Sequence, residues 1–500
     1  MTTTEKWGIF QLDIKGPETG NPFTQQNIQG TFKNKNETVE TKGFYDGCGS
    51  YKIRFMPSFE GEYSYEISCS FSSETVKGSF TAVKPSAGNH GPVRSANTYH
   101  LAYEDGTPYY SMGTTCYVWE LQNEETIQET LDTLSQGYFN KIRFCIFPKH
   151  YVYNFADPKT FPYEGTPVDN SNITEENFWE YSDCKGNHWD FERFNPEHFQ
   201  NIEKYILELQ KLGIEADIIV MHPYDRWGFS KMPANCDDLY WKYVLARFSA
   251  YRNVWWSLAN EYDLMKEKSL KDWERFAAII CANDPYSHLR SIHNCGPYYD
   301  YTRPWITHCS MQRQDLYRHV EYTSDFRTRY GKPIVWDEIA YEGNIEHAWG
   351  NISGQELVRR FWEASLRGGY AGHGETYLNP DNILWWSHGG KLHGESPERI
   401  KFLHSILSET PGIGLKPGDE IFGEVMAVPE SCGYQEDYEL HYYGFCRPSS
   451  RQFSKKPGIK YKAEVIDTWE MTINSAGVFS GKFIIPLPGK EYMAIRLVKI

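Results

Sequence analysis

"NPEHFQNIEKYILELQKLGIEADIIVM", residues 195–221, places a helix directly before a strand. Asn195 is a favourable helix N-cap, Pro196 suits the first turn, and Gly213 suits the end of the helix. Apolar side chains share one helical face at Ile202, Tyr205, Ile206 and Leu209. An apolar run, "FNKIRFCIF" (139–147), precedes this unit. Such alternation of strands and helices predicts parallel βαβ units.

The same alternation extends in both directions along the chain. Short apolar runs predict strands near residues 109–114, 141–147, 214–221, 253–259, 289–294, 305–311, 333–339 and 370–376. Because eight parallel strands close a (β/α)₈ TIM barrel, we predict an α/β protein with this barrel at its centre. A doubly wound open sheet is the alternative, since periodicity does not report closure.

The two ends of the chain have the patterns of antiparallel β structure. In "YKIRFMPSFEGEYSYEIS" (51–68), apolar residues fall on every second position around a Pro/Gly turn, which predicts a hairpin. After residue 410 the sequence returns to short β runs. We therefore predict an N-terminal β-sandwich domain (1–88), a catalytic barrel (95–410) and a C-terminal β-sandwich domain (411–500).

Composition excludes several classes of partner. The 500 residues carry a formal charge of −15 without a dense Lys/Arg stripe, so neither nucleic acid nor an anionic membrane is predicted to bind. The 11 cysteines include no CxxC pair, and neither phosphate-loop, dinucleotide nor HExxH motifs occur, so no cofactor and no metal is predicted. The first ten residues lack the features of a secretory signal, which predicts a cytoplasmic protein.

Two carboxyl groups stand where a barrel would hold its active site. Glu261 follows the fourth predicted strand and Glu338 ends the seventh. Barrel enzymes react at the carboxyl ends of their strands, and a pair of carboxyls there suits hydrolysis of a glycosidic bond. The residues alone leave open which of the two is the acid and which is the nucleophile.

The strand-end motifs resemble those of the clan A retaining glycoside hydrolases. "SLANEYD" (257–263) is similar to their strand-four signature, and "KPIVWDEIAYEG" (332–343) is similar to their strand-seven signature. The resemblance implies that Glu261 is the acid/base and Glu338 the nucleophile. It also implies that Asn260 binds the sugar 2-hydroxyl and that Arg143, in "KIRF", keeps the nucleophile charged.

Motifs outside the barrel resemble one bacterial family of glycosidases. "GNPF" (20–23), "GFYDGCGSYKIRFMP" (43–57) and "GKEYMAIRL" (489–497) are similar to those of proteins with a β-sandwich, an apiosidase-like barrel and a final β domain. The expected activity is retaining hydrolysis of O-glycosyl bonds. The cytoplasmic prediction favours an exo-acting enzyme on plant-derived or other small glycosides and oligosaccharides.

Further substrate-binding candidates come from the ends of strands three, six and eight. They are His222, His308, Gln312, Glu375, Trp385 and Trp386. For each histidine a structural role is an equal alternative, and Glu375 could equally form an ion pair. A tryptophan at 385 or 386 is favoured as a floor under the sugar, whereas Glu342 is expected beyond the barrel rim.

Two other functions, and assembly into a homo-oligomer, are also compatible with the sequence. The chain could be a non-catalytic carbohydrate-binding or scaffold protein that keeps the barrel. It could also be a metal-dependent TIM-barrel hydrolase, although its 16 histidines form no tight ligand motif. The terminal β domains could bind carbohydrate, brace the barrel or form a homo-oligomer interface.

Overall fold

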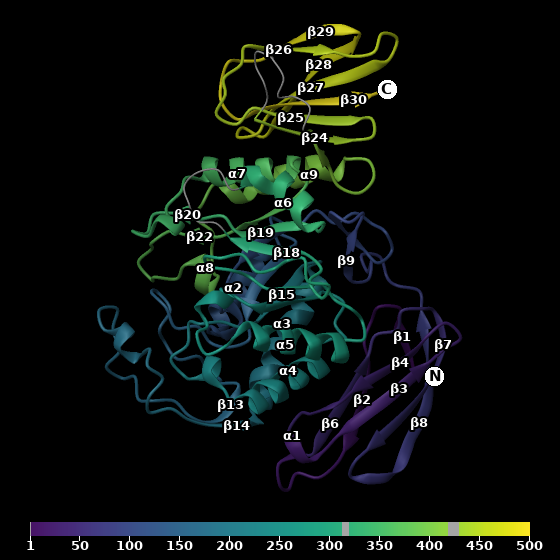
Figure 1. The fold of residues 1–500 in the computed structure, drawn as a ribbon, viewed down its shortest axis with the longest axis vertical. Coiled ribbons are helices and arrows are strands. Elements are labelled where there is room, and N and C mark those ends of the chain that lie inside the picture. The colour runs from purple at the N-terminus through teal and green to yellow at the C-terminus, as the bar shows by residue number, and fades with distance from the viewer. Residues whose placement is uncertain (1, 313–319, 419–429) are drawn as a thin grey trace.

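The centre of the molecule is a nearly closed parallel barrel of eight strands (Figure 1). The structure, a computed structural model, describes residues 2–312, 320–418 and 430–500. The barrel strands are β11 (Met112–Thr115), β12 (Lys141–Cys145), β15 (Glu215–Met221), β16 (Val254–Ala259), β17 (Arg290–Ser291), β18 (Cys309–Gln312), β19 (Ile334–Glu338) and β21 (Tyr370–His373). Because the first strand, β11, pairs with the last, β21, the sheet curls upon itself as in a TIM barrel and is not doubly wound.

One junction of the barrel, between β17 and β18, is made differently. In the described residues no ladder of paired strand residues joins these two strands. Ser291 Oγ instead donates to His308 O at 2.6 Å and accepts from Ser310 N at 3.1 Å. One backbone bond, from Thr307 N to Arg290 O at 3.0 Å, and these side-chain hydrogen bonds therefore close the seam between the fifth and sixth strands.

Helices surround the barrel and alternate with its strands. They are α2 (Glu124–Leu134), α3 (Pro196–Lys211), α4 (Ala234–Phe248), α5 (Leu270–Asn283), α6 (Thr323–Tyr330), α7 (Gly354–Leu366), α8 (Trp385–His388) and α9 (Ser396–Ser408). The predicted start of α3 is confirmed, because Asn195 Oδ1 accepts the N–H of Glu197 at 3.1 Å and Pro196 occupies the first turn. Loops between these elements add the short pairs β13 (Tyr163–Thr166) with β14 (His188–Phe194), and β20 (Glu342–Gly343) with β22 (Glu375–Thr376).

The N-terminal strands form two facing sheets. One contains β1 (Thr3–Glu5), β8 (Ser72–Val83), β7 (Gly61–Cys69), β3 (Ile28–Lys33) and β4 (Thr38–Lys42). The other contains β2 (Phe10–Lys15), β6 (Ser50–Phe55) and β5 (Phe44–Tyr45), with the short helix α1 (Pro22–Gln25) nearby. The pair β9 (Val93–Ala96) and β10 (His100–Tyr103) follows before the barrel.

The hairpin predicted for residues 51–68 is wrong. β6 pairs with β2 and β5, whereas β7 pairs with β3 and β8. The Pro57 turn carries the chain from one sheet to the other, and Phe55 and Tyr63 then meet in the core between the sheets, with ring centroids 5.3 Å apart. Alternation identified both strands, but it carries no information on which strand each one pairs with.

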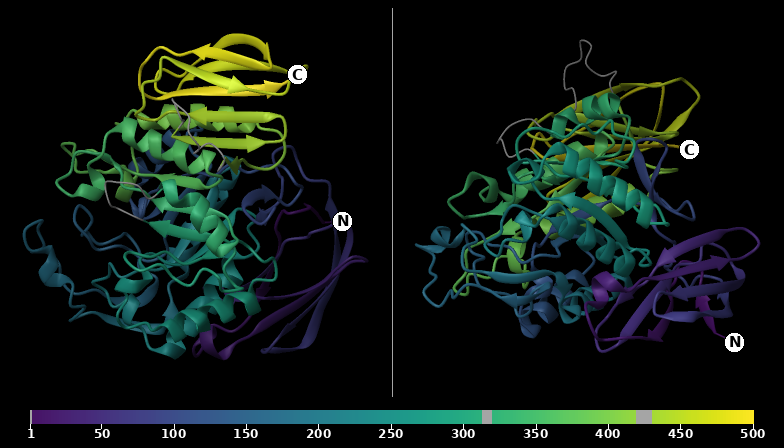
Figure 2. Two further views of the ribbon diagram at one scale, coloured as in Figure 1. Left: turned by 45° about the horizontal axis from the view of Figure 1, so that its top comes forward. Right: turned by 60° about the horizontal axis from the view of Figure 1, so that its bottom comes forward.

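The C-terminal strands lie on the side of the barrel that carries α7 and α9 (Figure 1, yellow; Figure 2). One sheet contains β23 (Lys416–Pro417), β24 (Ser431–Gln435), β25 (Tyr438–Tyr442), β30 (Met493–Lys499), β27 (Lys460–Asp467) and β28 (Thr472–Ser480). β26 (Ser450–Ser454) pairs separately with β29 (Lys482–Pro486). Trp362 of α7 stacks on Tyr442 with centroids 5.2 Å apart, which ties this sheet to the barrel.

All 11 cysteines are free thiols. No helix within residues 2–312, 320–418 and 430–500 is long and apolar enough to cross a bilayer.

An ion cluster occupies the barrel interior. Lys141 Nζ of β12 lies 2.7 Å from Asp217 Oδ2 of β15 and 2.6 Å from Asp337 Oδ1 of β19. All three side chains are buried. The cluster fixes three strands, including the strand that carries Glu338.

Replacing Lys141 with methionine is expected to lower the free energy of unfolding by about 3–5 kcal/mol, since it leaves two buried carboxylates without their cation. Urea denaturation followed by tryptophan fluorescence measures the change. Lys77→Met is the matched control, because the pair Lys77–Glu66 is 60% exposed on both sides. Equal stability of the two variants would contradict a structural role for the buried cluster.

Candidate active site

Glu261 lies just beyond β16 in a strained backbone conformation. Its φ and ψ are 50° and 56°, in the left-handed region that non-glycine residues rarely adopt. Gln312 Nε2 donates to Glu261 Oε1 at 2.5 Å, and the Tyr224 hydroxyl donates to Oε2. A strained backbone conformation persists only where surrounding contacts hold it, and such residues cluster at functional sites. Glu261 is therefore a candidate functional group.

Glu338 ends β19 and is surrounded by hydrogen-bond donors. Its Oε1 accepts from the Tyr117 hydroxyl at 2.5 Å and from the Arg143 guanidinium at 2.9 Å. His293 Nε2 lies 3.3 Å from the same oxygen. The second guanidinium nitrogen of Arg143 donates to Asn260 Oδ1 at 2.8 Å, so one cation links the two predicted strand-end motifs.

The surroundings shift the pKa values of the two carboxyls in opposite directions. Burial, together with the negative charge of Glu338, raises the pKa of Glu261 to about 7. Burial acts in the same direction on Glu338, but His293, Arg143 and the Tyr117 hydroxyl outweigh it and hold the pKa of that carboxyl well below its usual range. Near neutral pH a protonated acid can therefore stand beside an ionised carboxylate.

A buried ammonium group adjoins both carboxyls. Lys149 Nζ lies 3.4 Å from the ring centroid of Tyr117, 4.4 Å from Tyr224 and 4.7 Å from Trp386. Burial lowers the pKa of Lys149 to about 8, and the negative charges of Glu261 and Glu338 act against that shift. Aromatic faces attract cations, so these rings help to hold a buried ammonium group at this place.

Most of the predicted binding residues lie close to this centre. Asn260 accepts a hydrogen bond from Arg143, and Gln312 donates one to Glu261. His222 packs against Tyr224 with ring centroids 6.5 Å apart, and burial lowers its pKa to about 3, so the ring is neutral.

The two predicted tryptophans have different positions. Trp386 packs edge-on against Tyr117, with centroids 5.8 Å apart, within the aromatic group. Trp385 instead donates its Nε1–H to Thr114 Oγ1 at 2.8 Å and is buried behind the barrel strands. Of the pair, only Trp386 belongs to the aromatic group around Lys149.

Two predicted residues lie elsewhere. His308 precedes β18, at the opposite end of that strand from Gln312, and its ring packs against Trp255 at 5.3 Å. Glu375 accepts the backbone N–H groups of His393 and Gly394 at 2.5 and 2.8 Å. Neither contacts Glu261 or Glu338 in the described hydrogen bonds.

Sequence reasoning missed Tyr117, Lys149, Tyr224 and His293. His293 had a usable signal, because it is a polar side chain near the carboxyl end of the fifth predicted strand, 289–294. Lys149 and Tyr224 stand in loops after strands two and three without periodicity or a motif, so the fold alone brings them to the centre.

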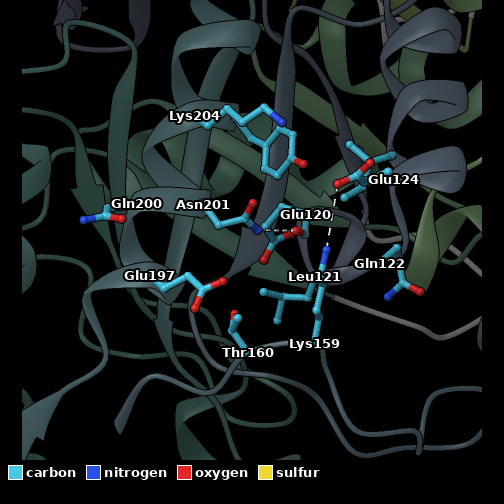
Figure 3. Close-up of a pocket in the computed structure, with 12 residues that line it drawn as sticks. Glu120, Leu121, Gln122, Glu124, Lys159, Thr160, Glu197, Gln200, Asn201 and Lys204 are labelled. Carbon is cyan, nitrogen blue, oxygen red and sulfur yellow. Dashed lines mark hydrogen bonds and ion pairs between the residues drawn. The ribbon is translucent and has the colours of Figure 1, made fainter. Parts of the chain in front are cut away.

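A separate cavity of about 270 Å³ opens on the outer face of the barrel (Figure 3). It is lined by residues of the turn after β11, the loop near Lys159 and helix α3, and by neither Glu261 nor Glu338. Both carboxyl oxygens of Glu120 are buried without a partner among the described residues, and burial raises the pKa of this group well above its usual range. Glu120 is thus a buried carboxyl remote from the candidate site.

Fold and site together define a glycoside-hydrolase-like α/β barrel protein. The chain belongs to the family of the apiosidase-like catalytic domain, whose profile matches residues 95–408. Two domains of unknown function match the ends, DUF5060 at residues 3–70 and DUF5605 at residues 427–498.

Solved structures agree with this assignment. A protein of Bacteroides vulgatus, named a "putative glycoside hydrolase", is 34% identical with a TM-score of 0.92, and 100% of each chain is covered. A glycoside hydrolase family 5 protein of the same organism is 15% identical with a TM-score of 0.61, covering 82% of this chain and 94% of its own, and shares the fold. No curated protein matches the sequence.

Proposed function

We propose that the protein is a retaining glycoside hydrolase in which Glu338 is the nucleophile and Glu261 the acid/base. The placement of these two buried carboxyls at the ends of two barrel strands, joined through Arg143 and Asn260, carries the proposal, and their opposite pKa shifts support it. Retention requires one ionised carboxylate to attack the sugar and one protonated carboxyl to assist departure of the leaving group. The environments of Glu338 and Glu261 match those two needs.

In the first step, Glu338 attacks the anomeric carbon while Glu261 gives its proton to the glycosidic oxygen, which leaves as an alcohol. In the second step, ionised Glu261 takes a proton from water, and the resulting hydroxide displaces Glu338 from the anomeric carbon. Arg143 and Tyr117 hold one oxygen of the Glu338 carboxylate and so orient the other for attack. Asn260, oriented by Arg143, is placed to bind the sugar 2-hydroxyl.

The enclosure of the site favours a small substrate attacked at its end. Glu261 and Glu338 are only 4% and 5% exposed, and Trp386 is 3% exposed. We therefore assign exo action on small glycosides or oligosaccharides, with plant-derived glycosides among them. His222, Gln312 and Trp386 are proposed to line the sugar site. The segments 1–88, 95–410 and 411–500 are proposed as separate domains, of which the middle one is catalytic.

A panel of aryl glycosides tests the reaction class. Apioside, xyloside, arabinoside, glucoside, galactoside and galacturonide would be offered to wild type and to Glu338→Gln. Turnover of one glycoside by wild type and its loss in the variant would support hydrolysis and name the sugar. Binding of sugars without turnover of any glycoside by folded wild type would favour the carbohydrate-binding function.

Replacing Lys149 with methionine is expected to shift the basic limb of the pH profile of kcat/KM upwards. The Lys149 cation lowers the pKa of Glu261, so its removal favours the protonated acid at higher pH. The profile is measured with an aryl glycoside that wild type hydrolyses. Lys149→Arg keeps the positive charge and should retain the wild-type limb. An unshifted limb in Lys149→Met would show that the ammonium does not act on Glu261.

A further inference from the structure

Outside the carboxyl pair, three buried ligand-type side chains converge beside the barrel. Glu342 of β20, Glu375 of β22 and His373 at the end of β21 each offer one ligand atom, and these atoms all lie within 4.8 Å of one another. The three residues are 1%, 1% and 0% exposed. β20 and β22 lie next to α8, the helix that carries Trp386 (Figure 1).

Strand pairing forces the two carboxyls together. Glu342 and Glu375 are direct partners across the parallel pair β20–β22. Like charges that face each other across paired strands destabilise a sheet. Burial increases this loss of stability, because it removes water from both charges.

One backbone segment holds both carboxyls in place. Glu375 accepts the N–H groups of His393 and Gly394, and Glu342 accepts those of Glu395 and Ser396 at 2.8 and 3.1 Å. A side chain at Gly394 would lie 2.4 Å from Glu342 Oε2 and 2.7 Å from Glu375 Oε2, so glycine leaves room for both oxygens. Glu342 Oε1 also accepts the Tyr377 hydroxyl at 3.2 Å. Each carboxylate oxygen has two lone pairs, so Glu342 Oε2 and both oxygens of Glu375 keep acceptor capacity for a cation.

The third member, His373, points to a ligand independently of the carboxyls. Its Nδ1 lies 2.9 Å from Thr114 Oγ1, whereas its Nε2 is buried and has no hydrogen-bond partner in the described chain. Thr114 Oγ1 has a lone pair besides the one that accepts Trp385 Nε1–H, so it can also accept a proton carried on Nδ1 of His373. In that tautomer Nε2 presents a lone pair, which is the arrangement typical of a histidine that ligates a metal.

We propose that Glu342, His373 and Glu375 bind a divalent first-row metal ion with a structural role. Two carboxylates balance the charge of such an ion, and a mixed set of oxygen and imidazole donors suits zinc or manganese better than magnesium. The ion would fasten the loop of residues 377–395, which carries Trp386, to β20 and β22. It takes no part in the attack on the sugar.

Refolding with and without metal tests the site despite its burial. The full chain is unfolded in urea with a chelator and refolded with zinc, manganese or neither, and bound metal is then counted by mass spectrometry. We expect one ion per chain and a Tm several degrees higher in the loaded protein, because the ion binds the folded state only.

Glu375→Gln should lose the bound ion and the Tm shift, whereas the matched control Glu120→Gln, a buried carboxyl elsewhere, should keep both. If refolded wild type holds no stoichiometric metal and its Tm ignores excess zinc and manganese, the proposal is overturned. Equal loading of wild type and Glu375→Gln would overturn it as well.

Discussion

Glu338→Gly is expected to lower kcat on an aryl glycoside by about 10⁴-fold or more, since loss of a covalent nucleophile has effects of this order in other enzymes. Added azide should restore part of the rate, because the missing carboxylate leaves space for a small anion at the anomeric carbon. Its product would be a glycosyl azide of inverted configuration, identified by NMR.

The control for this variant is Glu346→Gly, which removes a carboxyl that is 86% exposed on the loop after β19 and should leave kcat unchanged. Near-normal activity of Glu338→Gly would refute the nucleophile assignment. A rescued product with retained configuration would instead give Glu338 the acid/base role, because azide would then react with a glycosyl-enzyme.

Glu261→Gln should show an effect that depends on the leaving group. A dinitrophenyl glycoside needs little protonation to depart, whereas an alkyl glycoside should lose about 10²- to 10⁴-fold in kcat/KM, the usual contribution of general acid catalysis. The ratio between the two substrates measures the contribution of the proton donor.

The pH profile gives a second readout for Glu261. The pKa of this acid is raised to about 7, and it must be protonated to act, so wild-type kcat/KM should fall as the pH rises through about 7. Glu261→Gln carries no ionisable group there and should lose that basic limb. Glu267→Gln, an exposed neighbour on the same loop, should keep it. A limb that survives in Glu261→Gln belongs to another group.

The fold could be predicted where local pattern and tertiary structure agree. The buried runs of "IEADIIVM" and "KPIVWDE" became β15 and β19, since strands covered on both faces consist mainly of apolar residues. Partners of strands are a tertiary property, which is why β6 and β7 looked like a hairpin. Barrel geometry in turn predicted that Glu261 and Glu338 would end on one rim.

The rest of the site depends on contacts between loops. Lys149 has no pattern in "FPKHYVY", yet three aromatic rings from separate loops surround it. The sequence could not distinguish the positions of Trp385 and Trp386 either, because two adjacent residues of a short helix point to different surroundings. The packing of α8 decides that Trp386, and not Trp385, joins the aromatic group around Lys149.

The seam between β17 and β18 is the junction of the barrel at which a single substitution can most easily change the active site. Seven junctions of the barrel are ladders, whose register a single substitution cannot easily alter. At the eighth, Ser291 and Ser310 join the strands through a short side chain. Gln312 lies on β18 beside this seam, and its side chain donates a hydrogen bond to Glu261. Exchanging these small side chains is therefore expected to change the spacing of the two strands beside Gln312, while the seven ladders keep the register of the remaining strands.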